Sequence, residues 1–305
     1  MPFDSIFRPG LFVGQTHIVT GGGSGIGRCT AHELAHLGAT VVLVGRRADR
    51  LEGVRAEITD AGGRAFTFAG DHRDEDTARG IARAALDATG RIDGLVNNAG
   101  GQFAAPLASI AKKGWEAVVA NNLTGGFLCA RECYTQWMAE HGGAIVNVVA
   151  DMWGSMVGMG HSGAARAGMV SFTETAAVEW AASGVRVNAV APGAIASSGF
   201  DTYPDWMQPH LASAHAAIPA ARLGTESEVS AAICFLLSPA AAFISGSVLR
   251  VDGAAPNARL ASPLSALRDK DAPLPIPWPL DVHDRSVPWH GFHLGRRIHR
   301  WGGSQ

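Results

Sequence analysis

The stretch Thr20-Gly21-Gly22-Gly23-Ser24-Gly25-Ile26-Gly27 decides the fold, because it joins a short β-branched run to a helical pattern through a glycine-rich turn. Glycine lets the backbone turn sharply and approach a pyrophosphate, whose charge the N–H groups and positive end of the following helix would hold. The spacing is GxxxGxG, which differs from the GxGxxG of the usual dinucleotide fingerprint. The alternative is a tight strand-to-helix loop that binds nothing. The candidate cofactor-binding residues here are Gly21, Ser24, Gly25, Ile26 and Gly27.

Outward from this turn, short β-branched runs alternate with helical patterns along most of the chain. The runs that we predict as strands are His17–Thr20, Thr40–Val44, Ala65–Ala69, Leu95–Asn97, Ala144–Val149, Val185–Ala191 and Ser247–Val251. Their apolar character is typical of strands buried on both faces. Because helical patterns separate them, right-handed crossovers should place them in a parallel sheet. We therefore predict an α/β fold, a single Rossmann-type doubly wound seven-stranded parallel sheet, over residues 1–255.

The character of the chain changes near Ala254. Residues 256–305 are rich in Pro, Trp, His and Arg and show no sustained periodicity, so we expect an extended C-terminal tail rather than a second domain. Its residues Trp278, Trp289 and Trp301 would be poor side chains to leave in water, which favours docking on the parent domain or on a neighbouring subunit. A histidine pair in this tail lacks further ligands at metal spacing, and we expect no metal site.

Composition narrows the classes of partner. The 305 residues are 47% hydrophobic with a net charge of −2, and the charges are interspersed, so no nucleic acid is expected. The start of the chain lacks a secretory signal, and no apolar run reaches the roughly 18 residues that a membrane span needs. The cysteines lie in apolar or helical stretches without metal spacing, so we predict reduced thiols and a cytoplasmic protein. They are Cys29, Cys129, Cys133 and Cys234.

The second predicted strand ends in Arg46 and Arg47. An acidic residue at this point usually binds the ribose 2′-hydroxyl of NAD, whereas an arginine can pair with a 2′-phosphate. The pair therefore favours NADP(H), with Arg46 as the candidate contact. The alternative is that both arginines are solvated charges at a strand end.

Three motifs in order identify a resemblance to the short-chain dehydrogenase/reductase family over residues 11–253. They are the glycine turn, the segment Asn97-Asn98-Ala99-Gly100 and the dipeptide Pro192-Gly193. The resemblance implies a homotetramer that packs through two long helices, expected over about Gly114–Met138 and Gly163–Ser183, with the tail as a possible interface element.

The same resemblance implies further cofactor contacts. Asp71 would contact adenine, and the adenosine side would be lined by Asn98, Ala99 and Gly100. The nicotinamide carboxamide would be held by Ile195 and Ser197, next to Pro192 and Gly193.

The catalytic motif departs from the family pattern, in which a Tyr-x-x-x-Lys pair acts with a serine and an asparagine. The asparagine is present as Asn122, but Ser162 stands at the tyrosine, Arg166 at the lysine, and Val149 or Ala150 at the serine. A serine hydroxyl is far less acidic than a phenol, yet it can donate a hydrogen bond. Arginine remains a permanent cation that can support an oxyanion or the cofactor ribose. The site suits stabilisation of an enolate better than deprotonation of an alcohol.

Local segments narrow the resemblance. The stretches His161–Gly168, Gly100–Phe103 and Glu140–Gly143 resemble peroxisomal trans-2-enoyl-CoA reductases and bacterial relatives, some of them citronellol or citronellal dehydrogenases. The resemblance implies an NADP(H)-dependent oxidoreductase that reduces the conjugated double bond of a trans-2-enoyl or dienoyl thioester. One alternative is a terpenoid alcohol or aldehyde dehydrogenase. Another is a non-catalytic NADPH-binding subunit.

The sequence does not decide which residue donates the proton to the substrate. Tyr134 falls within a long helix that is expected to pack, so Tyr203 is the candidate phenol near the substrate. In the alternative interpretation Tyr203 packs the loop Phe200–Trp206. His161 and Asp151 could also relay a proton, although such residues often cap helices or loops.

Overall fold

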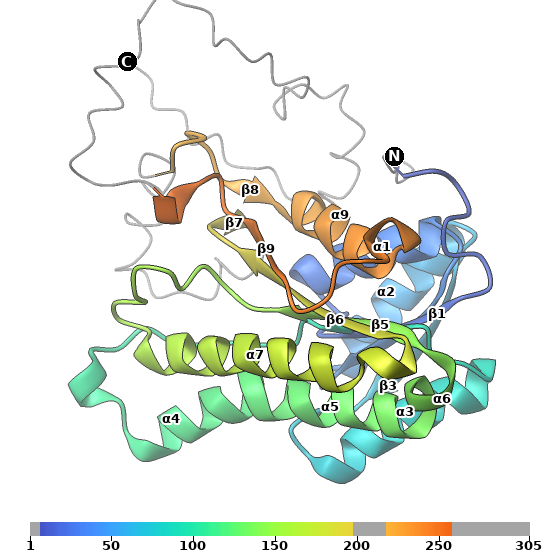
Figure 1. Ribbon diagram of the computed structural model, residues 1–305, viewed down its shortest axis with the longest axis horizontal. Coiled ribbons are helices and arrows are strands. Elements are labelled where there is room, and N and C mark those ends of the chain that lie inside the picture. The colour runs from blue at the N-terminus through green and yellow to red at the C-terminus, as the bar shows by residue number, and fades with distance from the viewer. Residues whose placement is uncertain (1–6, 198–217, 258–305) are drawn as a thin grey trace, which may run out of the picture.

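A parallel sheet runs through the middle of the protein and carries helices on both faces (Figure 1). This computed structural model describes residues 7–197 and 218–257. The seven strands follow the order β3-β2-β1-β4-β5-β6-β9, so the order reverses between β1 and β4. They are β1 (Thr16–Thr20), β2 (Thr40–Gly45), β3 (Arg64–Ala69), β4 (Gly94–Asn97), β5 (Gly143–Val148), β6 (Val185–Pro192) and β9 (Val248–Val251). The predicted doubly wound parallel sheet is confirmed.

Helices pack on the two faces as separate layers. The α-helices are α1 (Gly25–His36), α2 (Ala48–Asp60), α3 (Glu75–Thr89), α4 (Lys112–Val119), α5 (Gly125–Cys133), α6 (Ala139–His141), α7 (Gly160–Glu179) and α9 (Glu226–Leu237). Helices α1, α2 and α9 bury apolar residues in a core with one face of the sheet, and α3, α5 and α7 form the core of the other face. Figure 1 shows the two layers above and below the strands.

Local sequence explains where these helices start and stop. The Asp74 carboxylate accepts a hydrogen bond of 2.8 Å from the Thr77 N–H and so caps α3. The same helix ends at Gly90, whose φ of +73° is a left-handed conformation that favours glycine. Helix α9 opens with a capping box between Thr225 and Glu228.

The edges of the sheet differ from the prediction that all strands are buried on both faces. In β3 and β9 every residue is partly or fully exposed, and Phe66 of β3 is 44% exposed. Each of these strands has a neighbour on one side only, so its apolar residues cover the rim of the sheet. Sequence reading also missed a small two-stranded pair, β7 (Ile195–Ala196) with β8 (Gly224–Thr225).

The two long helices predicted from sequence are present with different internal structure. The first continues from α4 into a π-helical segment, Ala120–Thr124, then through α5 into a second one, Tyr134–Met138. The second helix, α7, begins at Gly160, three residues before the predicted start at Gly163. Its first turn therefore includes His161 and Ser162.

Three further predictions concern the cysteines, membrane-spanning helices and the C-terminal tail. The four cysteines are buried and form no disulfide, and burial raises the pKa of Cys129 to about 12. Within residues 7–197 and 218–257, no helix has the length and apolar character needed to cross a membrane. Tyr203 and the tail from residue 258 onward lie outside the described residues.

Candidate active site

The glycine turn after β1 forms a cradle at the start of α1. Gly21 and Gly25 have φ values of +66° and +57°. A Cβ atom built at Gly27 would lie 2.3 Å from the carbonyl oxygen of Gly21, so only glycine fits there. Ser24 precedes the helix, and the first turn of α1 contains no acidic side chain. These features fit the pyrophosphate of a dinucleotide, which the N–H groups of α1 would hold.

Hydrogen bonds join the loop after β4 to this cradle. The Asn98 side chain donates to the carbonyl of Thr20 at 3.0 Å, and the N–H groups of Asn98 and Ala99 both donate to the Thr20 hydroxyl at 3.0 Å. A Cβ at Gly21 would come within 2.8 Å of the Asn98 side-chain nitrogen. The structure thus brings together the residues that sequence assigned to the pyrophosphate and adenosine.

The adenosine part of the dinucleotide cofactor would lie where the neighbouring strands β2 and β3 end. Arg46 directly follows β2 and is exposed, and Asp71 follows the neighbouring strand β3. The guanidinium of Arg73 binds the Asp71 carboxylate, with 2.8 Å between Nε and Oδ1. This hydrogen bond is the main cause that lowers the pKa of Asp71 to about 2. Sequence analysis did not assign Arg73, because nothing in its spacing distinguishes it from a solvated charge.

Asn122 lies in the first π-helical segment and is 4% exposed. Its side-chain nitrogen donates to the carbonyls of Gly101 at 2.7 Å and Val118 at 2.8 Å. Its oxygen accepts from the Gly101 N–H at 3.2 Å. A Cβ at Gly100 would lie 2.8 Å from both this oxygen and the Arg166 guanidinium. Gly100, Asn122 and Arg166 therefore converge.

Ser162 and Arg166 lie one turn apart on α7, and both are buried. The Ser162 hydroxyl donates a 2.8 Å hydrogen bond to the side-chain oxygen of Gln102. Arg166 donates from Nη1 to the Val148 carbonyl at the end of β5, at 2.5 Å. Sequence analysis gave Gln102 no role. The position of Gln102 in the segment Gly100–Phe103, which resembles the enoyl-CoA reductases, was the one signal that could have identified it. Its hydrogen-bond partner Ser162 lies 60 residues further along the chain, so the contact could not be read from the sequence.

Two candidate proton carriers also lie near these residues. His161 is fully buried, its ring packs edge-on against Phe103 at 4.4 Å between centroids, and neither ring nitrogen has a hydrogen-bond partner. Asp151 follows the end of β5 and has one buried carboxyl oxygen without a hydrogen bond. Burial, and then the charge of Asp252, raise the pKa of Asp151. Neither residue caps α7, whose N-cap is Met159.

The residues expected near nicotinamide follow β6. Pro192 ends that strand, and a Cβ at Gly193 would lie 2.8 Å from the Cα of Asp252. Ile195 is buried in β7, and Ser197 is the last residue described before the gap. These positions share one edge of the sheet with Asp151, whose N–H donates to the Pro192 carbonyl at 2.9 Å.

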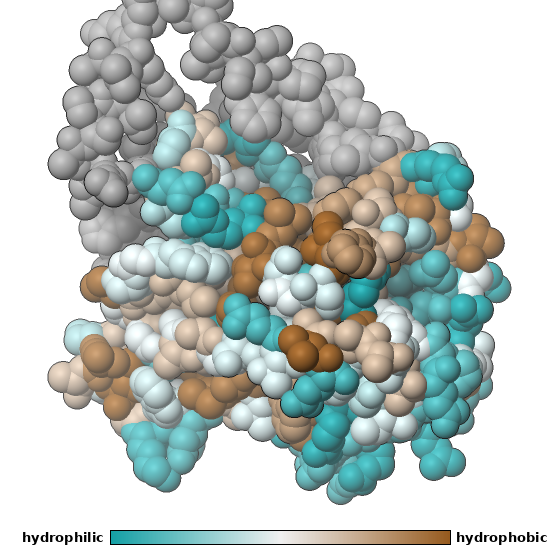
Figure 2. Space-filling view, in the orientation of Figure 1, coloured by the Kyte–Doolittle hydropathy of each residue, from teal (hydrophilic) through white to brown (hydrophobic). Residues whose placement is uncertain are grey.

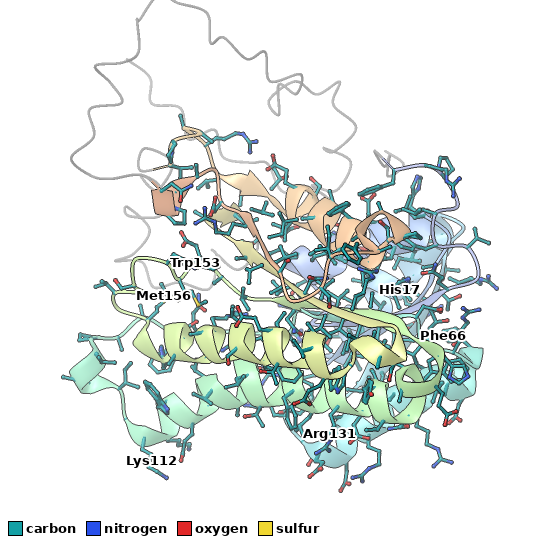
Figure 3. The ribbon with its side chains drawn as sticks, in the orientation of Figure 1. His17, Phe66, Lys112, Arg131, Trp153 and Met156 are labelled. Carbon is teal, nitrogen blue, oxygen red and sulfur yellow. The ribbon has the colours of Figure 1, made fainter. Side chains whose placement is uncertain are left out.

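Apolar side chains surround this edge. Phe103 and Leu107 come from the loop after β4, Trp153 and Val157 come from the loop before α7, and all are exposed by 37% or more. The Ala105 N–H donates to the Gly158 carbonyl at 2.8 Å, which joins the two loops. Figure 3 shows Trp153 on the loop that leads into α7. An apolar substrate group would find matching surface here.

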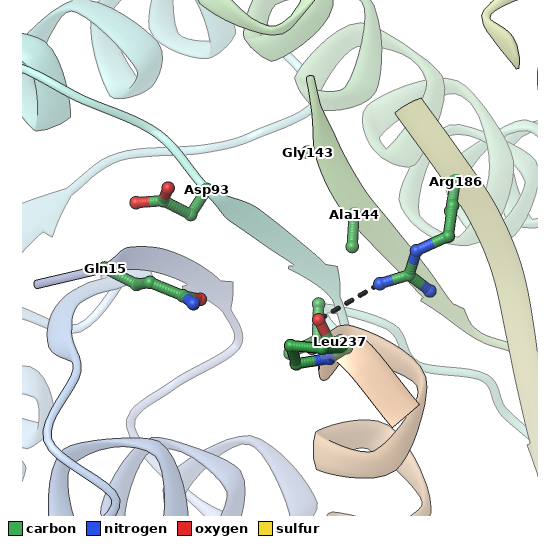
Figure 4. Close-up of a pocket in the computed structure, with 7 residues that line it drawn as sticks. Gln15, Asp93, Gly143, Ala144, Arg186 and Leu237 are labelled. Carbon is green, nitrogen blue, oxygen red and sulfur yellow. Dashed lines mark hydrogen bonds between the residues drawn. The ribbon is translucent and has the colours of Figure 1, made fainter. Parts of the chain in front are cut away.

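A separate pocket lies at the opposite edge of the sheet, where β4, β5 and β6 begin (Figure 4). Its most polar residues are Asp93 and Arg186. The Arg186 guanidinium donates to the carbonyls at the end of α9, including that of Leu236 at 2.6 Å, and Asp93 accepts from the Thr16 N–H at 2.8 Å. These groups stabilise the junction of the strands with α9. None of the predicted site residues lines this pocket.

Comparison with known proteins gives the family context. The family described as Enoyl-(Acyl carrier protein) reductase matches residues 21–254. A protein of Bacillus subtilis named probable 2,4-dienoyl-CoA reductase, (2E)-enoyl-CoA-producing, is 38% identical over 239 residues. That alignment covers 77% of this chain and 94% of the relative.

Solved structures agree on the fold. A citronellol catabolism dehydrogenase of Pseudomonas aeruginosa is 59% identical to this chain, with a TM-score of 0.76. The match covers 83% of this chain and the whole of the Pseudomonas chain. A structure from Beutenbergia cavernae, described as an NAD(P)-dependent gluconate 5-dehydrogenase with NADP bound at low occupancy, is 35% identical with a TM-score of 0.76. The match covers 82% of this chain and 100% of the Beutenbergia chain.

Proposed function

The chain belongs to the short-chain dehydrogenase/reductase family, and we propose that it uses NADPH to reduce the conjugated carbon–carbon double bond of a trans-2-enoyl or dienoyl thioester. Membership makes the chain an oxidoreductase, so we do not retain the alternative of a non-catalytic subunit. The observation that carries the substrate proposal is the buried Ser162, which stands at the position of the family's tyrosine and donates to Gln102.

A serine can stabilise an oxygen anion but cannot exchange a proton with an alcohol near neutral pH. NADPH, when bound, supplies a hydride for the β-carbon of the thioester. We assign Ser162 to the thioester oxygen, which replaces the Gln102 oxygen as the acceptor of its hydrogen bond. Arg166, one turn further along α7, adds a permanent positive charge beside the developing enolate. Asn122 holds the Gly101 backbone, and with it the loop that carries Gln102.

The preference for NADPH rests on Arg46. It follows β2 directly and forms no ion pair or hydrogen bond within the described part of the chain, whereas the neighbouring Arg47 pairs with Asp49 at 2.7 Å. A guanidinium at this strand end is suited to a 2′-phosphate. The bound NADP of the Beutenbergia structure supports the same choice.

The second candidate function is oxidation of an acyclic terpenoid alcohol or aldehyde. The identity of 59% to a citronellol catabolism dehydrogenase favours it. The apolar rim of Phe103, Leu107, Trp153 and Val157 would accept a terpenoid chain as readily as a fatty acyl chain. Alcohol oxidation requires a general base, however, and Ser162 cannot be that base.

A substrate screen separates the two candidates. The first prediction is that the protein oxidises NADPH with trans-2-enoyl-CoA or 2,4-dienoyl-CoA, and that Ser162→Ala lowers this turnover by roughly 10²–10³-fold with little change in NADPH affinity. The matched control is Ser171→Ala, an exposed serine on the same helix, which should leave turnover unchanged. Rapid NADP-linked oxidation of citronellol, with no reduction of enoyl thioesters of any chain length, would reject the proposal.

A further inference from the structure

His72 is a buried histidine in the loop between β3 and α3, one residue after Asp71. It is only 7% exposed, so its ring nitrogens have little access to water and need partners in the protein. Its Nε2 lies 3.1 Å from the main-chain carbonyl oxygen of Asn121. Asn121 belongs to the π-helical segment Ala120–Thr124, next to Asn122. The loop after β3 thus contacts the segment that carries Asn122.

The direction of this hydrogen bond follows from its atoms. A carbonyl oxygen can only accept, so Nε2 of His72 donates to the Asn121 carbonyl. Burial is the largest cause that lowers the pKa of His72, so near pH 7 the ring is neutral and carries its single N–H on Nε2. The other nitrogen, Nδ1, lies 4.0 Å from Oδ1 of Asp71. The ring therefore presents one fixed donor to the π-helical segment.

The π-helical segment explains why this carbonyl needs a donor from another element. In an α-helix the Asn121 carbonyl would accept from the Gly125 N–H, four residues further along. Here the Gly125 N–H donates instead to the Ala120 carbonyl, five residues back. The His72 N–H takes the place of the donor that the π turn has moved away. This hydrogen bond therefore stabilises the π turn relative to a regular α turn.

Gly125 also leaves room for the imidazole ring. A Cβ atom built at Gly125 would lie 2.6 Å from Nε2 of His72, so a larger residue there would collide with the ring. His72 therefore contacts this part of the helix at two points, the Asn121 carbonyl and the backbone of Gly125. Both contacts lie within four residues of Asn122.

We propose that His72 is a positioning residue, which holds the π turn and thereby places Asn122 for the reaction. This inference rests on the proposed function, in which Asn122 holds the Gly101 backbone through hydrogen bonds of 2.7 and 3.2 Å. A shift of the π turn would move Asn122, and with it the loop that carries Gln102, the hydrogen-bond partner of Ser162. His72 acts on the reaction through Asn122 and not by contact with the substrate.

The kinetic test compares His72→Leu with His72→Gln. Leucine removes the donor, whereas glutamine places an amide N–H near the position of Nε2. We expect His72→Leu to lower kcat for enoyl-CoA reduction about 10-fold, because a small displacement of groups at the site already slows a reaction. His72→Gln should keep kcat within about threefold of the unaltered enzyme, and the Kd for NADPH should change less than about threefold in both variants.

His141→Leu is the matched control. Nδ1 of His141 also donates to a carbonyl in a π-helical segment, that of Trp137 at 2.9 Å. His141 is exposed, however, and this second segment, Tyr134–Met138, carries none of the predicted site residues. The control should therefore match the unaltered enzyme in kcat.

A double variant tests the route through Asn122. In an Asn122→Ala background, His72→Leu should change kcat by less than about twofold, because the side chain that His72 positions is already absent. Losses that multiply would show that His72 acts through other groups, and would overturn the inference. A His72→Gln enzyme as slow as His72→Leu would overturn it as well.

Hydrogen–deuterium exchange provides a readout that needs no turnover. The Gly101 N–H donates to Oδ1 of Asn122, so its exchange rate reports where that side chain lies. Exchange at Gly101 and across residues 120–126 should be roughly 10-fold faster in His72→Leu, and unchanged in His72→Gln and His141→Leu. If His72→Leu does not fold, His72→Asn takes its place, because its amide is one methylene shorter than that of glutamine and cannot reach the Asn121 carbonyl.

The two proposals fail in different ways. Unchanged exchange in a folded variant without the donor would overturn the role of His72 and leave the proposed function intact. If the unaltered enzyme reduces no enoyl thioester, the proposed function fails, and the exchange rates still decide whether His72 holds Asn122 in place.

Discussion

Ser162 and Arg166 change what this site can do relative to the family's Tyr-Lys pair. The phenol of that pair is both hydrogen-bond donor and proton source, and lysine lowers its pKa. In the proposed function the two tasks would be divided, because Ser162 can donate a hydrogen bond but a separate acid would have to supply the proton. Arg166 cannot substitute as that acid, since a guanidinium does not lose its proton in proteins.

Arg46 provides the most direct test of cofactor choice, and the second prediction concerns this residue. Arg46→Gln should weaken NADPH binding about 10- to 100-fold and leave NADH binding almost unchanged, because one charge-assisted phosphate contact is lost. Fluorescence titration with both cofactors measures this. Arg47→Gln is the matched control, because that side chain pairs with Asp49. Equal affinity of the unaltered protein for NADPH and NADH would contradict the assignment.

Sequence could nominate the residues of the site but not their partners. Asn122, Ser162 and Arg166 were found through motif spacing, and the structure brings Asn122 and Arg166 together around Gly100. Gln102 could not be assigned, because its contact with Ser162 depends on how the loop after β4 crosses the first turn of α7.

At the scale of elements, the π-helical segment Ala120–Thr124 places Asn122 against the loop after β4. A π turn widens the helix and shifts the residues that follow around its axis. Asn122 makes three hydrogen bonds to the Gly101 and Val118 backbone from this segment. Helical periodicity predicted one continuous helix here, because the sequence pattern of a π turn hardly differs from that of an α turn.

The third prediction follows from this placement. Asn122→Ala should destabilise the fold by about 1–3 kcal/mol, because the buried Asn122 side chain loses its three hydrogen bonds to the Gly101 and Val118 backbone. It should also lower kcat, since Gln102 follows in the same loop. Chemical denaturation and steady-state kinetics measure the two effects. The control is Asn121→Ala, the adjacent residue of the π segment. Equal stability of the two variants would show that the Asn122 hydrogen bonds do not hold the loop.

Element types were predicted correctly from sequence, but some boundaries and exposures were not. Helix α7 starts at Gly160 rather than Gly163, because glycines at its start carry no periodic signal. The exposure of β3 and β9 reflects their place at the sheet edges, which alternation of residues cannot reveal. The β7–β8 pair has two residues in each strand and is too short for any pattern.

At the scale of the whole molecule, the layer of α5 and α7 is the face through which we predict a homotetramer. Phe127 of α5 is 38% exposed and Val178 of α7 is 79% exposed. Figure 2 shows hydrophobic residues among hydrophilic ones over this layer. The Tyr134 ring stacks on the Trp180 ring, with 4.3 Å between the ring centroids. Tyr134 therefore packs within the helix layer, as expected from its place in a long helix.

Two buried histidines couple the stability of the whole fold to pH. His17 on β1 is fully buried against Phe12, and burial is the main cause that lowers its pKa to about 4. Burial likewise lowers the pKa of His32 on α1 to about 4, although its hydrogen bond to Glu57 opposes the shift. Both residues are neutral in the folded protein at pH 5, whereas an unfolded chain, with a pKa near 6.5, would bind a proton at each.

The fourth prediction is that the free energy of unfolding falls as pH decreases from about 6.5 to about 4. The unfolded state binds more protons in this window, so acid favours it, and below both pKa values the loss is complete. At pH 5 a fully buried His17 should account for about 2 kcal/mol of this loss. Denaturant unfolding of His17→Leu at pH 7 and pH 5, at one protein concentration, should therefore show a smaller pH dependence than the unaltered chain. His36→Leu, at an exposed position of the same α1 layer, should keep the full dependence, and an unchanged slope in His17→Leu would assign the acid sensitivity to other groups.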